Sequence, residues 1–284
     1  MRRKDALFGL LTAAMLALAL PPLIALLRST RSLEYYSHIP LIAAVSAYLI
    51  FRRRRDVFLG KESFHPLGIV AIAVGLGLGL ATILLVPEPA NRATLVVFSS
   101  LVFWWGAYLI LYGKPASRRA LFPLAFLLFA VPVPVQVLKG VIGALVLGST
   151  FLTSLLFTGL GVPFVQEGPI FHLPDFSIEV AQQCSGIRSS LALLVTTVLA
   201  GHLFLKKPWK QALLALAVFP VSLIKNAVRI VTLYLLSFFV DIRIIEGGFL
   251  HKSGGFLFFG LGLLILGFLL WLLTDKEGTG LSRQ

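Results

Sequence analysis

Cys184 is the residue of this 284-residue chain best suited to nucleophilic chemistry. It is the chain's one cysteine, so it cannot form an internal disulfide or a CxxC metal or redox pair. Ser185 and Gly186 follow it, and an apolar run over 187–205 predicts a helix directly after them. A helix N-terminus stabilises a thiolate, and Arg188 in the first turn would add to the effect. Polar neighbours disfavour the alternative, an inert buried thiol.

A second candidate lies in a later apolar run, residues 211–240, where charges would sit at membrane depth. Lys225, Asn226 and Arg229 share one helical face at spacings of three and four. Intramembrane charges are costly and usually functional, which makes Arg229 a site candidate; the alternative is an arginine that snorkels to the outer headgroups. Because arginine stays protonated, it would donate hydrogen bonds to an oxyanion or a carboxylate. Asn226 is expected to support it, and Lys225 to support the site or contact lipid.

His251 is the third candidate, because a histidine can activate a cysteine as general base and then protonate a leaving amine. The other four histidines are interpreted as structural: His38, His65, His172 and His202. No two histidines stand at ligand spacing, so we expect no metal site, and nothing in the sequence calls for a cofactor.

The composition places these residues in a membrane protein. Hydrophobic residues make up 58% of the chain and charged residues 13%, and the mean hydropathy is +0.93. Apolar runs of about 20 residues recur along the chain, which is the length that a bilayer requires. The net charge of +13 would suggest nucleic-acid binding in a soluble protein, but basic loops are how membrane proteins fix their orientation. We therefore predict an all-α polytopic integral membrane protein without a nucleic-acid partner.

The basic residues predict the topology. If the main clusters are cytoplasmic, that face holds 16 of the 25 basic residues; the clusters are 2–4, 52–55 with Lys61, 114–119, 206–210 and the C-terminal tail. Arg119 and Lys206 then lie on the same side, although three apolar runs separate them, so one run does not cross. The Gly-, Ser- and Thr-rich run 140–162 is the candidate, as an interfacial or re-entrant helix. About eight transmembrane helices result, with both termini cytoplasmic.

This topology brings the three candidates to one face. Cys184 becomes external, and Arg229 lies 19 residues after Lys210, about 28 Å of helical rise and nearly the whole hydrocarbon thickness. His251 falls in a predicted external loop, residues 241–252. Nothing in the sequence spacing of the three residues required this convergence.

The segment 168–181 differs from its surroundings. Two short alternating runs flank Pro174-Asp175, which predicts a short external β-hairpin. Because it leads directly to Cys184, it would shape a groove for an extended peptide. A loop packed over the helices is the equally weighted alternative.

The ordered set of motifs resembles the exosortase/archaeosortase family. The set is Cys184-Ser185-Gly186 before an apolar helix, then Asn-x-x-Arg at 226–229, then an outer-face histidine, His251. Two further segments are more weakly similar to the family, namely Tyr36-Ser37-His38 and the run Phe129-Ala130-Val131-Pro132-Val133-Pro134. Ile39 departs from the glycine expected after the Ser-His pair, so His38 is given no role.

The resemblance implies a membrane cysteine protease/transpeptidase that cleaves a C-terminal sorting signal of exported proteins. Cys184 would attack the carbonyl, Arg229 would stabilise the oxyanion and His251 would move the proton. Supporting roles fall to Ser185, Gly186, Arg188 and Asn226. The partners would be exported proteins with a C-terminal motif, transmembrane helix and basic tail, and the acyl group would pass to water, a lipid or another amine.

The predicted organisation is a single transmembrane domain over 1–284 in the inner (plasma) membrane. Its external active-site face would form around 163–188, 226–229 and 241–252. Two alternatives from other classes stay open. A membrane transporter would also bury Arg229 and Lys225, although no inverted repeat is evident. A non-catalytic scaffold for envelope assembly would not need Cys184.

Overall fold

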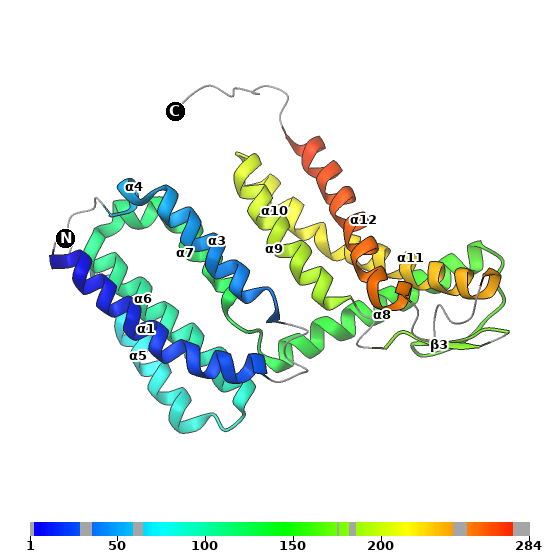
Figure 1. Cartoon of the computed structure of the whole chain (residues 1–284), viewed down its shortest axis with the longest axis horizontal. Coiled ribbons are helices and arrows are strands. Elements are labelled where there is room, and N and C mark those ends of the chain that lie inside the picture. Colours follow the sequence, from blue (N-terminus) through cyan, green and yellow to red (C-terminus); the bar gives the residue numbers. More distant parts are fainter. Residues whose placement is uncertain are drawn as a thin grey trace. The chain divides into compact units, whose positions relative to one another are not determined.

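The structure is a computed structural model that describes residues 3–28, 36–58, 65–174, 176–181, 186–240 and 249–274. The described part consists of α-helices and one small antiparallel sheet (Figure 1). The chain divides into two compact units, Met1–Leu138 and Lys139–Gln284. The predicted all-α membrane architecture is confirmed, whereas the single domain stays a prediction.

Unit 1 is built around the long helix α6, against which α1 and α5 pack. Small residues allow α5 and α6 to approach closely: a Cβ on Gly75 would lie 2.6 Å from the backbone nitrogen of Phe103. An aromatic cluster joins α1 to α6 through Phe8 and Trp104, whose rings are 5.3 Å apart. The helices of unit 1 are α1 (Arg3–Arg28), α3 (Ile39–Arg52), α4 (Arg54–Phe58), α5 (Pro66–Leu85), α6 (Pro89–Arg119), α7 (Leu121–Phe126) and the 3-10 helix η1 (Leu127–Ala130).

Unit 2 carries the chemistry that the sequence predicts. Its α9, α11 and α12 pack around a shared apolar cluster that includes Leu193, Val218, Val221 and Leu266. The elements are most of α8 (Val135–Gly159), β1 (Val165–Glu167), β2 (Ile170–His172), β3 (Ser177–Glu179), α9 (Ile187–Phe204), α10 (Pro208–Leu216), α11 (Val218–Phe239) and α12 (Phe249–Leu273).

The sheet has the strand order β1-β2-β3, with both pairs antiparallel. The pair β2–β3 confirms the predicted hairpin around Pro174. β1 was not predicted, because three residues are too few to show an alternating pattern. Phe171 of β2 is fully buried and contacts Phe157 of α8, so one face of the sheet packs on the helices.

In the part of the chain that the structure describes, seven helices are long and apolar enough to cross a membrane, with α10 and α11 taken together as one. Two further apolar runs of the sequence, residues 38–51 and 119–138, are also predicted to span the membrane but fall short of this length among the described residues. The run 38–51 forms the 14-residue helix α3. The run 119–138 is broken after η1 by the extended segment around Pro132 and Pro134, which cannot donate backbone hydrogen bonds to continue the helix.

Helix α8 is one of these seven, although the charge distribution predicts that it does not cross. In unit 1 it begins beside the N-terminus of α6, where the Val135 backbone nitrogen donates to Asn91 Oδ1 at 3.2 Å. In unit 2 it runs parallel to α11, because Ser149 meets Asn226 and Phe157 meets Tyr234. The interfacial placement of α8 and the number of crossings stay predictions.

Candidate active site

Helix α11 places Lys225, Asn226 and Arg229 on one face, as their spacing predicts. Lys225 is 3% exposed and Asn226 is 1% exposed. The interpretation of Lys225 as a lipid contact is therefore wrong. Its stem instead packs near α12, where a Cβ on Gly262 would lie 3.4 Å from Lys225 Cδ.

The N-terminus of α9 faces this part of α11. Gly186, the residue before α9, has a φ of +71°, a conformation that glycine adopts without strain. A Cβ on Gly186 would lie 3.5 Å from each of three polar atoms, namely Lys225 Nζ, Asn226 Oδ1 and Ser189 Oγ. The turn after the predicted nucleophile therefore lies against the Lys225–Asn226 face of α11.

Two hydroxyl groups tie this turn to helix α9 itself. Ser189 Oγ and Ser190 Oγ both donate to the backbone oxygen of Gly186, at 2.8 and 2.9 Å. Lys225 Nζ donates to Ser189 Oγ in turn. A continuous chain of hydrogen bonds thus runs from α11 to the start of α9.

Asn226 connects the same face to a third helix. Its Nδ2 donates to Ser149 Oγ of α8 at 3.0 Å, and both side chains are almost fully buried. The bond holds the asparagine with its amide oxygen toward Gly186. The supporting role of Asn226 and Gly186 in catalysis stays a prediction.

Arg229 lies one helical turn beyond Lys225 and is partly exposed. Its Nε is buried and has no hydrogen-bond acceptor in the part of the chain that the structure describes. A buried donor without a partner costs about 1–3 kcal/mol. Arg229 therefore offers a donor that can be satisfied by a bound group.

The remaining predicted site residues are described less fully. Cys184 and Ser185 lie outside the described residues, and Arg188 is exposed in the first turn of α9. The backbone at His251 belongs to the first turn of α12, which begins at Phe249, so the predicted loop 241–252 is wrong at its end. His251 precedes Gly262 by 11 residues, about 16 Å along the α12 axis.

These positions share one end of unit 2. Helix α9 runs antiparallel to α11, because its Ser189 meets Lys225 and its Leu193 packs with Val218 and Val221. The start of α9 and the start of α12 therefore lie toward the same end of the three helices (Figure 1). Arg229 follows Lys225 along α11 in the direction of that end. The structure thus brings the middle of α11 and the turn at Gly186 together.

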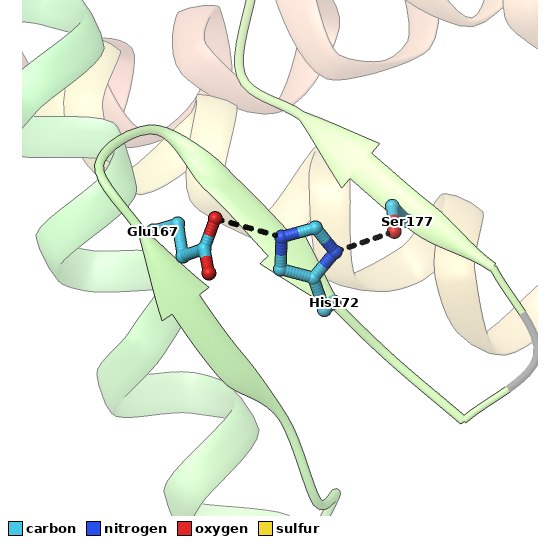
Figure 2. Close-up of polar contacts among 3 residues, drawn as sticks. All are labelled: Glu167, His172 and Ser177. Carbon is cyan, nitrogen blue, oxygen red and sulfur yellow. Dashed lines mark hydrogen bonds and ion pairs between the residues drawn. The ribbon is translucent and has the colours of Figure 1, made fainter.

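The sheet carries a second polar group, shown in Figure 2. His172 Nδ1 lies 2.8 Å from Ser177 Oγ, and His172 Nε2 lies 3.4 Å from Glu167 Oε2. These contacts join all three strands on the face opposite Phe171. Because these contacts link β2 to both of its neighbouring strands, they fit the interpretation of His172 as a structural residue.

Sequence reasoning missed Ser149 and Ser189 as parts of the site. A signal for Ser189 was present, since it lies in the first turn after Gly186, where hydroxyl groups commonly bond to the backbone. Ser149 gave no such signal, because its partner Asn226 is 77 residues away in the chain.

Comparison with known proteins identifies the chain. The family model described as transmembrane exosortase (Exosortase_EpsH) matches residues 30–268, most of the chain, including every predicted site residue. No curated protein and no solved structure matches it. The protein therefore belongs to the transmembrane exosortase family.

Proposed function

We propose that this protein is a membrane-embedded cysteine transpeptidase that cleaves C-terminal sorting signals through Cys184, Arg229 and His251. The exosortase family is a family of membrane cysteine peptidases and transpeptidases that act on exported proteins with such signals. The observation in unit 2 that supports the proposal best is the buried Arg229 Nε without an acceptor in the described part of the chain. Arg229 lies one helical turn beyond Lys225, which contacts the turn at Gly186. Gly186 in turn follows Cys184 by two residues.

The proposed reaction has two acyl-transfer steps. The Cys184 thiolate attacks the carbonyl carbon of the scissile peptide bond, and the carbonyl oxygen becomes an oxyanion that accepts hydrogen bonds from Arg229. Collapse breaks the C–N bond, His251 gives a proton to the leaving amine, and a thioester remains on Cys184. An amine or water then attacks the thioester, His251 takes up its proton, and the thiolate leaves.

The proposed site faces the exterior, with both termini in the cytoplasm. The charge bias of the loops supports this orientation. The structure adds that α10 and α11 form a nearly continuous run of 32 residues, with Arg229 some 32 Å of rise beyond Pro208. That distance matches the hydrocarbon thickness.

The test is processing of a co-expressed exported protein that carries a C-terminal motif, a transmembrane helix and a basic tail. Wild-type protein should release the tail, and Cys184→Ser should abolish release, because a serine hydroxyl is far less ionised than a thiol. Ser154→Ala is the matched control, since Ser154 bonds only to its own helix. Full processing by Cys184→Ser at equal membrane abundance would remove Cys184 from the mechanism.

A further inference from the structure

Lys225 is a buried cation for which the proposed reaction has no assigned use. It is 3% exposed and lies between α9, α11 and α12. Taking an ammonium group out of water costs several kcal/mol unless other groups compensate. A methionine or leucine would fill the same space without that cost, so the charge requires an explanation.

The partner of Lys225 is a hydroxyl group rather than a carboxylate. Nζ donates to Ser189 Oγ, and Ser189 donates to the backbone oxygen of Gly186 at 2.8 Å. Within the described ranges, no carboxylate forms an ion pair with Lys225. A buried ammonium without a carboxylate partner would be stabilised by an anion that forms near the N-terminal turn of α9.

Two further basic residues stand close in sequence to the contact between Gly186 and Lys225. Arg188 lies on α9 and Arg229 on α11. Helix α8 has no charged residue after Lys139, and the part of α12 from 253 to 273 has none. The N-terminus of α9 adds its own partial positive charge. All of these contributions favour an anion beside the turn.

We propose that Lys225 is a positioning residue for Cys184: it holds the Gly186 turn through Ser189, and its charge favours the thiolate. The inference rests on the proposed function, because it assigns the anion to Cys184, two residues before Gly186 in sequence. Lys225 takes no part in bond making or breaking. Arg229 serves the oxyanion of the substrate, whereas Lys225 serves the nucleophile.

The experiment compares Lys225→Met with Lys206→Met, which removes one exposed basic residue away from the turn. Two quantities are measured in membrane vesicles, the tail-release rate and the pH dependence of Cys184 alkylation. A nearby cation favours the thiolate. Lys225→Met should therefore raise the pH of half-maximal alkylation by about one unit and slow alkylation at neutral pH about tenfold. Lys206→Met should leave both quantities unchanged.

Ser189→Ala provides a second, independent variant. It keeps the Lys225 charge but removes the link to the Gly186 turn, so tail release should fall severalfold with a smaller shift of the alkylation profile. If Lys225→Met does not accumulate in the membrane, Ser189→Ala decides alone, and wild-type tail release then overturns the proposal.

The outcomes separate this inference from the proposed function. Normal processing by Cys184→Ser would overturn both the proposed function and the role of Lys225. Loss of processing by Cys184→Ser, together with a wild-type rate and pH profile for Lys225→Met, would remove only the role of Lys225. A lower rate for Lys225→Met with an unchanged alkylation profile would make the residue merely structural and would also overturn the inference.

Discussion

The amide nitrogen of Asn226 lies 3.0 Å from the hydroxyl oxygen of Ser149, so a buried hydrogen bond joins α11 to α8. The bond orients the asparagine, whose amide oxygen faces Gly186 at the start of α9. Three helices are thereby connected through one side chain. This arrangement gives Asn226 a physical role that its position in the Asn-x-x-Arg motif alone could not define.

Ser149→Ala should destabilise the protein, because it leaves the buried Asn226 amide without its acceptor. Loss of such a partner costs about 1–3 kcal/mol. Thermal unfolding in detergent should show a lower midpoint for Ser149→Ala than for Ser154→Ala, whose hydroxyl bonds only within α8. Equal midpoints would mean that the Asn226–Ser149 bond contributes nothing to stability.

Cys184 should react with a membrane-impermeant thiol reagent added from outside. The positive-inside rule predicts an external position, and the labelling is specific because the chain has one cysteine. The measurement is made on intact cells, or on spheroplasts if an outer membrane intervenes. Labelling confined to inverted vesicles would overturn the topology and, with it, the catalytic proposal.

Arg229→Lys should be severely impaired although it keeps the charge. Arginine presents a rigid fork of donors, whereas lysine is a compact charge on a flexible stem. Loss of an oxyanion donor typically lowers the rate by about 100- to 1000-fold. The check is the tail-release rate at matched membrane abundance, with the exposed Arg118→Lys as control. Near-normal release would leave Arg229 as a charge or a lipid anchor.

Gly186→Ala should lower both stability and processing. The φ of +71° costs a residue with a side chain about 1–2 kcal/mol. Steric clash adds little, because the new Cβ would be at 3.5 Å from its nearest neighbours. Gly186→Asn should be tolerated better, since asparagine visits this conformation more readily. If alanine and asparagine behave identically, backbone strain is not what selects glycine here.

Much of this protein could be predicted from its sequence because bilayer physics imposes strong patterns on a chain. Apolar runs of spanning length, the helical spacing of Lys225, Asn226 and Arg229, and the hairpin around Pro174 are all local features. Local features depend on residues a few positions apart, so they can be recognised without knowing the fold. The helical face on α11 and the hairpin are confirmed.

Other features were decided by tertiary packing. The burial of Lys225, its bond to Ser189 and the pairing of Asn226 with Ser149 join residues 36 and 77 positions apart. Helical periodicity describes which residues share a face, but it cannot tell whether that face meets lipid or another helix. Both environments suit an apolar helix equally well, so sequence reasoning left open a lipid contact for Lys225. Only the packing of α9 and α12 against α11 excludes it.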